Sequence, residues 1–532
     1  MNIINAENLT KSYTERKLLD KASFYLQEGE KVGVIGINGT GKSTLLKIIA
    51  GLEEPDEGQV TCANHIVVRY LPQNPVFDPE MTVLDSVLTQ CVLNFVGSGR
   101  TERTDADAHA QEQKWSLESD AKSMMTRLGI TDFTQKTGEL SGGQRKRLAL
   151  VAALLVPCDV LILDEPTNHL DSAMADWLEN YLKKWRGALV MITHDRYFLD
   201  SVCNRIVEVD KGAIYSYETN YSGYLERKAE REESAEASER KRQSVLRKEL
   251  EWVRQNPKGR QAKSKARLAR FNELSEYEYQ KRNETQEIFI PVAERLGNDV
   301  IEFRHVSKSF GDRLLIDDLS FIIPAGAIVG VIGPNGAGKS TLFKMIAGQE
   351  QPDQGEILIG KTVRLSLVDQ SREALDNDKT VFEDISEGTD LISVGRFEMN
   401  ARAYLGRFNF KGSDQQKKVG NLSGGERGRL HLAKTLMKGG NVLLLDEPSN
   451  DLDVETLRAL EDALLEFAGS VIVISHDRWF LDRIATHILA FEGNSQVTFF
   501  EGNYQEYEAD KRKRLGEEGA KPKRLRYKPV TR

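Results

Sequence analysis

Two glycine-rich segments of this 532-residue sequence have the composition and spacing of a phosphate-binding loop. The first reads Gly-Ile-Asn-Gly-Thr-Gly-Lys-Ser-Thr over residues 36–44, and the second reads Gly-Pro-Asn-Gly-Ala-Gly-Lys-Ser-Thr over residues 333–341. Each follows an apolar run and precedes an apolar helical pattern, which is the strand, loop and helix order that a P-loop requires. A single match is compatible with a structural glycine turn, whereas two matches in one chain indicate two nucleotide sites.

The residue types in these loops predict how each loop holds a nucleotide. Glycines let backbone N–H groups converge on phosphate oxygens, the lysine reaches the β and γ phosphates, and the serine holds Mg²⁺. The predicted ligands are therefore ATP and Mg²⁺. The predicted binding residues of the first loop are Gly36, Asn38, Gly39, Gly41, Lys42, Ser43 and Thr44. Those of the second loop are Gly333, Asn335, Gly336, Gly338, Lys339, Ser340 and Thr341.

Each half also carries an Asp-Glu pair directly after a continuous apolar run. The pairs are Asp164-Glu165 and Asp446-Glu447. Such runs are typical of parallel strands buried on both faces, and α/β folds place ligands at the C-terminal ends of these strands. We predict that the aspartates bind Mg²⁺ and that the glutamates act as catalytic bases or polarise the attacking water. A role as helix caps is the alternative for one such pair alone.

Further residue types recur in register with the loops. Tyr13 and Phe310 are predicted to stack on adenine, and Gln73 and Gln370 to contact Mg²⁺ and the attacking water. Ser141, Gly142 and Gly143, with Ser423, Gly424 and Gly425, are predicted to bind an anion at a helix N-terminus. His194 and His476, each 29 residues past its glutamate, are predicted catalytic γ-phosphate sensors. Alone, each would be an ordinary aromatic, glutamine, serine N-cap or histidine. The matched spacing of these residues in the two halves favours a functional role for each of them.

Composition and charge exclude several classes of protein. The four cysteines form no CxxC pair, so neither a zinc site nor a disulfide framework is indicated. No signal segment and no apolar run of about 18 residues appears, so we expect a cytoplasmic chain that does not cross a membrane. The net charge is −8, but residues 254–270 and 511–532 together carry +15, which leaves −23 on the remainder. Any contact with nucleic acid should therefore be local.

Residues 223–298 lie between the two halves and are rich in charged helix formers. Two apolar helical patterns are interrupted at Asn256-Pro-Lys-Gly259, which predicts an antiparallel helical hairpin with a basic tip. The predicted RNA-binding residues are Arg254, Lys258, Arg260, Lys263, Lys265, Arg267 and Arg270. A solvated linker without a binding role is the alternative for a charge run of this kind.

The ordered set of motifs resembles the nucleotide-binding domain of ATP-binding cassette proteins, twice. Two cassettes, no membrane segment and a charged helical linker resemble the ABC-F family of ribosome-associated ATPases. The resemblance implies an α/β fold with two tandem P-loop ATPase domains joined by a helical hairpin. It divides the chain into a first cassette (1–222), a linker (223–298), a second cassette (299–508) and a basic tail (509–532).

The same resemblance implies how the chain works. The two cassettes of one monomer would close head to tail, so that Ser423 completes the site of Lys42, Glu165 and His194. Ser141 would complete the site of Lys339, Glu447 and His476. The expected partner is the ribosome near its E site, with the linker on P-site tRNA and 23S rRNA and with contacts to large-subunit proteins. Neither membrane nor DNA is an expected partner.

The first cassette departs from the family member that the linker and second cassette resemble. Its signature, Leu140-Ser-Gly-Gly-Gln-Arg-Lys-Arg147, looks more like the Uup-like branch. The first half has 15 more residues than the second between Gln73 and Ser141, which suffices for two helices of only about 10 Å each. We therefore expect the arm that contacts the ribosomal L1 stalk to be truncated or absent. An energising subunit of a transporter is the alternative function, and a DNA-repair or chromosome-organising ATPase is a weaker one.

Overall fold

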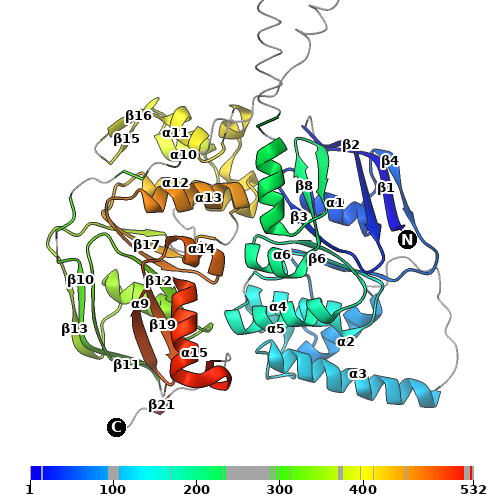
Figure 1. Ribbon diagram of the computed structural model, residues 1–532, viewed down its shortest axis with the longest axis horizontal. Helices are drawn as coiled ribbons and strands as arrows, with labels where there is room; N and C mark the ends of the chain where they lie inside the picture. Colours follow the sequence, from blue (N-terminus) through cyan, green and yellow to red (C-terminus); the bar gives the residue numbers. More distant parts are fainter. Residues whose placement is uncertain are drawn as a thin grey trace, which may run out of the picture.

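The computed structural model describes two α/β halves that lie side by side, the first coloured blue to green and the second yellow-green to red (Figure 1). The described residues are 2–13, 16–93, 107–234, 288–368, 375–520 and 528–529, apart from positions 169, 232, 289, 292–294, 298, 312, 396, 411, 450 and 451. The predicted RNA-binding residues and Gln370 lie outside this set.

A six-stranded sheet forms the centre of the first half, in the order β5-β6-β7-β3-β8-β9. All neighbours are parallel except β8 and β9. Because a parallel sheet places the ends of its strands on one edge, the P-loop after β3 and the Asp-Glu pair at the end of β6 come together. The strands are β3 (Lys31–Ile35), β5 (Val68–Leu71), β6 (Val160–Asp164), β7 (Ala188–Ile192), β8 (Arg205–Asp210) and β9 (Ala213–Tyr217).

The second half repeats this sheet in the order β14-β17-β18-β12-β19-β20. Its neighbours are again parallel except the last pair. The second P-loop follows β12, and its Asp-Glu pair lies at the end of β17. The strands are β12 (Ile328–Ile332), β14 (Leu365–Val368), β17 (Val442–Asp446), β18 (Ser470–Ile474), β19 (His487–Gly493) and β20 (Gln496–Glu501).

An antiparallel sheet flanks each central sheet. The first has the order β2-β1-β4, and the second has the order β13-β10-β11-β21. A separate hairpin, β15-β16, occurs in the second half. The strands are β1 (Asn2–Tyr13), β2 (Arg16–Gln27), β4 (Glu57–Cys62), β10 (Ile301–Phe310), β11 (Arg313–Ile323), β13 (Gln354–Ile359), β15 (Leu391–Val394), β16 (Phe397–Asn400) and β21 (Lys528–Pro529).

Helices pack against both faces of the central sheets (Figure 1). The helices of the first half are α1 (Lys42–Ile49), α2 (Val83–Leu93), α3 (Asp107–Arg127), α4 (Gly142–Leu155), α5 (Ser172–Lys184) and α6 (Arg196–Val202). Those of the second half are α9 (Lys339–Ile346), α10 (Val381–Ser386), α11 (Ala401–Arg407), α12 (Gly424–Leu436), α13 (Val454–Leu465), α14 (Arg478–Ile484) and α15 (Tyr504–Ala520). Residues 221–231 are also helical and are called the root helix below, because they lead from the first cassette into the linker.

The apolar runs found in the sequence are the innermost strands, which confirms the predicted α/β class. Every residue of β6 and β7 is buried, and four of the five residues of β17 are buried. Strands covered by helices on both faces have no polar face, so their sequences are continuous runs of Val, Ile and Leu. This burial fixes the strand ends that carry the carboxylates.

The extra residues of the first half lie in or before a long helix. Helix α3 has 21 residues, about 31 Å at 1.5 Å per residue, whereas its counterpart α11 has seven. The residue count bounded the extra segment to two helices of about 10 Å each; the described part contains one longer helix, and residues 94–106 lie outside the described residues. The truncation of the arm stays a prediction.

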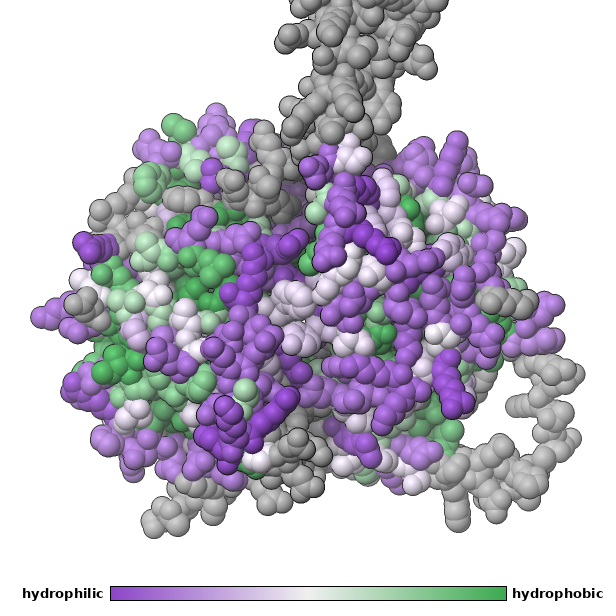
Figure 2. Space-filling model, viewed as in Figure 1, coloured by the Kyte–Doolittle hydropathy of each residue, from purple (hydrophilic) through white to green (hydrophobic). Residues whose placement is uncertain are grey.

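Hydrophilic residues cover much of the face shown in Figure 2, while hydrophobic residues gather mainly over the second half. Within the described residues, no helix is both long enough and apolar enough to cross a membrane.

Candidate functional site

The two P-loops have nearly identical backbone conformations. Gly36 and Gly333 both have φ of 147°, and Gly41 and Gly338 have φ of 98° and 108°. A Cβ on Gly36 would lie 2.4 Å from the carbonyl oxygen of Val209, so a side chain there would force the backbone apart. A Cβ on Gly39 would meet no atom within 4 Å. The loop is therefore packed on one side and open on the other, which suits a phosphate cradle.

Both P-loop lysines are almost fully buried and point into their own loops. The ammonium of Lys42 donates to the carbonyl of Gly36 at 2.5 Å, and that of Lys339 donates to the carbonyl of Gly333 at 2.5 Å. Burial lowers the pKa of both ammonium groups, while nearby carboxylates act in the opposite direction. Each lysine is thus a desolvated cation at the mouth of its loop, where it interacts strongly with anions.

Oxygen atoms suited to Mg²⁺ meet beside each lysine. The hydroxyl of Ser340 lies 3.3 Å from Oδ2 of Asp446. Burial raises the pKa of Asp164, and hydrogen bonding with Ser43 lowers it, so the same pair meets in the first half. A hydroxyl beside a carboxylate fits Mg²⁺, which usually takes one or two protein oxygens and completes its shell with phosphates and water. No cluster of three metal-ligating side chains occurs among the described residues, in keeping with such a shared shell.

The two glutamates adopt the left-handed backbone conformation, with φ of 54° at Glu165 and 51° at Glu447. This conformation is unfavourable for a residue with a side chain, by about 1–3 kcal/mol, and it is concentrated at functional sites. The backbone N–H of each glutamate donates to a neighbouring strand, Glu165 to Ile192 and Glu447 to Ile474, both at 2.9 Å. The strands therefore hold both carboxylates at the sheet edge.

Each predicted histidine lies against the glutamate of its own half. Nε2 of His194 is 3.1 Å from Oε1 of Glu165, and Nε2 of His476 is 3.5 Å from Oε1 of Glu447. In the second half, the same His476 nitrogen is also 3.1 Å from Nζ of Lys339 and 3.2 Å from Oδ1 of Asn335. The structure thus joins lysine, glutamate and histidine in one cluster.

Burial determines the charges of these groups. It lowers the pKa of both His194 and His476 to about 3, with the adjacent lysines acting in the same direction. Both imidazoles are therefore neutral at physiological pH. Burial raises the pKa of Glu447 to about 8, although Lys339 opposes this shift. A carboxylate with a raised pKa binds a proton more readily than an exposed one, which suits a group that accepts a proton from water.

The predicted adenine-stacking aromatics are exposed at equivalent hairpin ends. Tyr13 and Phe310 are each 48% exposed, so each ring lies partly at the surface. Lys11 and Lys308 approach these rings, with Nζ to centroid distances of 5.8 and 5.3 Å. Gln73 is exposed in the loop after β5, on the sheet edge that carries the first P-loop.

The two predicted signature serines cap helices α4 and α12. Each hydroxyl accepts a hydrogen bond from the backbone N–H three residues on, at 3.3 Å for both Ser141 and Ser423. Both are capping boxes, completed by Gln144 and Glu426. Within its own half, each serine therefore acts as a helix N-cap. A contact with nucleotide in the opposite half stays a prediction.

An aspartate of each half faces the P-loop of the other half, which the sequence analysis missed. Oδ2 of Asp453 lies 3.4 Å from the backbone nitrogen of Asn38. Burial lowers the pKa of Lys42, and the charge of Asp453 opposes this shift. Reciprocally, the charge of Asp171 opposes the lowering of the Lys339 pKa by burial. The available signal was the position of both aspartates six residues past their glutamates. Each nucleotide site is therefore bordered by both halves.

This arrangement predicts asymmetric effects of substitutions in the signature loops. Ser423→Arg should weaken nucleotide binding at the site of Lys42 at least tenfold, because the new side chain would occupy the place of the phosphate. Ser141→Arg should do the same at the site of Lys339. Nucleotide occupancy resolved site by site is the measurement. Loss at the site within the same half would show that the halves do not complete one another.

Comparison with known proteins extends these observations. The family model described as "ABC transporter" matches residues 19–168 and 316–450, and a second model with the same description matches residues 207–289. The chain is 53% identical to the energy-dependent translational throttle protein EttA of Haemophilus influenzae, over 97% of this chain and 96% of that protein. It is 46% identical to EttA of Mycobacterium tuberculosis, over 100% and 99% of the two chains.

Solved structures support the same fold. The archaeal ribosome recycling factor aABCE1, in complex with the ribosomal stalk protein aP1, superposes with a TM-score of 0.60 at 22% identity. The match covers 91% of this chain and 87% of that one. The RNase-L inhibitor gives a TM-score of 0.58 at 22% identity, with the same coverage. At these identities the likeness shows the fold alone.

The similarity to EttA spans the first half as well as the second, whereas the sequence motifs alone tied only the linker and second cassette to that protein. Assignment of the first cassette to the Uup-like branch stays a prediction. With two ABC matches over more than half its length and 53% identity to a throttle protein, the chain belongs to the ABC-F family of tandem-cassette ATPases.

Proposed function

We propose that this ATPase binds the ribosome and regulates translation through ATP binding and hydrolysis. The observation that carries the proposal is 53% identity, across 97% of the chain, to a protein named for energy-dependent control of translation. The local concentration of positive charge at residues 254–270 supports it, since ribosomal RNA is a polyanion and the rest of the chain is acidic.

The residues of each site have separable roles in hydrolysis. Lys42 and Lys339 would contact the β and γ phosphates, and the loop glycines would supply backbone N–H donors. Ser43 with Asp164, and Ser340 with Asp446, would hold Mg²⁺, which when bound neutralises developing charge on the phosphates. Glu165 and Glu447 would take a proton from the attacking water, and the neutral histidines beside them would sense the γ-phosphate.

On the ribosome, the linker would contact P-site tRNA and 23S rRNA from the E site, with further contacts to large-subunit proteins. The chain would act as a monomer whose two cassettes form an intramolecular dimer. This assigns residues 1–222 and 299–508 to the cassettes, 223–298 to the linker and 509–532 to the tail.

The transporter alternative has less support. One relative, from Bacillus subtilis, is described as an uncharacterized ABC transporter ATP-binding protein and is 42% identical over 95% of this chain. A transporter subunit has no evident use for seven basic residues between its cassettes. Recovery of the protein with membranes and not with ribosomes, after cell fractionation, would favour that alternative.

The linker substitution test addresses RNA contact directly. Replacing Lys258, Arg260, Lys263, Lys265 and Arg267 by Gln should flatten the salt dependence of ribosome binding by about 3–4.5 units, because four or five of these residues would contact phosphates and each neutralised phosphate contributes a slope of about −0.7 to −0.9. ATP affinity should not change. Co-sedimentation with ribosomes over a series of salt concentrations measures the slope.

The tail is the competing source of positive charge, so its removal is the control. Residues 521–532 carry six Lys and Arg residues and no acid. The deletion should begin at residue 521 and leave residues 511–520 in place, because Arg514 on α15 binds Glu492 and so helps to hold that helix. Should the deletion abolish ribosome binding while the five linker substitutions leave its salt slope unchanged, the linker is a passive spacer.

A further inference from the structure

One buried carboxylate of the first half binds three side chains of the root helix, which also packs against the first-half core through Tyr221 and Tyr224. Glu208 on β8 lies with Oε1 2.7 Å from Nζ of Lys228 and Oε2 2.8 Å from a guanidinium nitrogen of Arg231. The hydroxyl of Tyr224 donates to Oε1 at 3.1 Å. Burial alone would raise the pKa of Glu208, but Lys228 and Arg231 hold it below its usual range. The carboxylate is therefore ionised and anchors three side chains of the helix.

The same lysine reaches across to the second half. Nζ of Lys228 is 2.8 Å from Oε1 of Glu455, in the first turn of α13. The Lys228 side chain is 13% exposed and the Glu455 side chain is 35% exposed, so the ion pair is shielded from solvent on the lysine side and open to it on the glutamate side. Figure 1 shows the root helix standing between β8 of the first half and α13 of the second. Lys228 thus bridges carboxylates of both halves.

The turn of α13 that carries Glu455 also borders the first nucleotide site. Asp453, the N-cap of α13, accepts a hydrogen bond from Asn38 of the first P-loop and is held at 2.8 Å by Arg429. Residues two apart in one helical turn move as a rigid unit. A displacement of α13 relative to the first P-loop therefore also displaces Glu455 relative to Lys228.

The second half repeats the anchor but lacks the bridge. On α15, Tyr507 and Arg514 both contact Glu492 at 2.8 Å. Lys511 stands 5.8 Å from the Tyr507 ring, as Lys228 stands 5.5 Å from the Tyr224 ring. In the first half, the position equivalent to Glu455 is Ala173, two residues past Asp171. Alanine has no carboxylate that could pair with Lys511. Among the described residues, the bridge is therefore made by the root helix and has no equivalent on α15.

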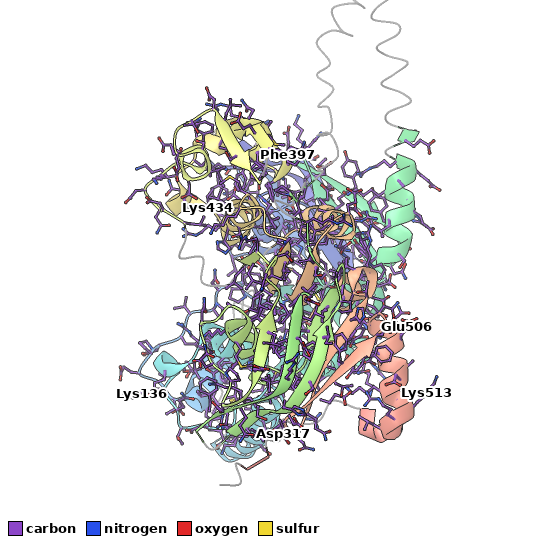
Figure 3. All side chains as sticks on the ribbon, turned by 90° about the vertical axis from the view of Figure 1, so that its left-hand side faces the viewer. Lys136, Asp317, Phe397, Lys434, Glu506 and Lys513 are labelled. Atoms are coloured by element: carbon purple, nitrogen blue, oxygen red, sulfur yellow. The ribbon has the colours of Figure 1, made fainter. Side chains whose placement is uncertain are left out.

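We propose that the Lys228–Glu455 ion pair transmits closure of the cassettes over the Lys42 site to the root helix and so to the linker. The effect of this motion on ribosome binding rests on the proposed function. The coupling between the nucleotide site and the root helix requires only that ATP brings the two halves together. Figure 3 shows the root helix at the same end of the molecule as Phe397 on β16. Motion of the root helix would therefore displace the chain at this end of the molecule.

Hydrogen exchange of residues 221–231 tests the coupling without ribosomes. The protein carries Glu165→Gln and Glu447→Gln so that bound ATP persists, and exchange is followed with and without Mg²⁺ and ATP. ATP should slow exchange in the root helix by about fivefold or more, the usual scale of coupling between linked sites. Adding Glu455→Gln, which removes the charge at constant size, should abolish this slowing while ATP affinity stays within about twofold.

Two matched variants separate the bridge from general loosening. Lys511→Gln changes the equivalent lysine of α15 and should leave the ATP effect on residues 221–231 intact. Asp462→Asn removes another carboxylate of α13, whose partner Arg483 lies in the same half, and should also leave it intact. The proposal fails if ATP does not slow exchange in the parent, if Glu455→Gln retains the slowing, or if Glu455→Gln loses ATP affinity. Failure of ribosome binding would leave this result standing.

Discussion

Replacing both Glu165 and Glu447 by Gln is expected to reduce ATP turnover by about 10²–10⁴-fold, the usual contribution of a positioned general base. ATP affinity should change little, because the P-loop contacts of Lys42 and Lys339 and the serine–aspartate pairs are untouched. Glutamine has the size of glutamate, so the left-handed backbone at both positions is retained. Steady-state phosphate release measures the turnover, and equilibrium nucleotide binding on the same preparation measures the ATP affinity.

The single variants serve as controls for this experiment. Each single variant should retain ATP turnover at the site whose glutamate is unchanged, unless hydrolysis at that site depends on the state of ATP at the other site. A parental rate in the double variant would show that neither carboxylate activates water. Loss of ATP binding would show that the glutamates hold the nucleotide, and the assignment of roles within the site would then be wrong.

Replacing Arg196 by Met is expected to destabilise the contact between the halves by about 3 kcal/mol, the lower end of the range for removing one partner of a buried ion pair. A guanidinium nitrogen of Arg196 lies 2.8 Å from Oε1 of Glu461, across the boundary between α6 and α13. Both side chains are at most 1% exposed, so the carboxylate oxygen would lose its cation without gaining water. Arg483, which contacts the other oxygen of Glu461, limits the loss.

The equivalent arginine of the second half is the matched control. Arg478 pairs with Asp176 at 2.5 Å, but the two side chains are 22% and 34% exposed. Pairs with this access to water contribute less, about 0–1 kcal/mol when fully exposed, so Arg478→Met should cost much less than Arg196→Met. Urea unfolding of the ATP-bound protein gives the comparison. Equal midpoints for the two variants would contradict the role assigned to burial.

The nucleotide sites were predictable because their parts are local. A P-loop is nine consecutive residues, and an apolar run before Asp-Glu identifies both a buried strand and its end. Since parallel strands end on one edge of a sheet, the sequence was enough to predict that Lys42, Asp164 and Glu165 lie together. The duplication also singled out candidate residues from chance matches, since His194 and His476 are equally spaced from their glutamates, and the structure places each against its glutamate.

Other features depend on packing that no local pattern encodes. The length of α3 did not follow from the sequence, because a residue count does not say whether extra residues form one helix or two. The pKa values of His194 and Glu447 follow from burial by residues distant in the sequence. The sequence indicates that these groups are present, whereas only the tertiary environment determines their charge.

The amino-acid sequence by itself determined two P-loop cassettes and a basic segment between them, and it predicted the catalytic residues, because periodicity and motif spacing are properties of neighbouring residues. Only the tertiary structure decided which residues of one half meet the other. Asp453 beside Asn38, Arg196 with Glu461 and Lys228 with Glu455 are each separated by more than 200 residues. Such contacts arise from the fit of two folded surfaces, and that fit joins each nucleotide site to the opposite half.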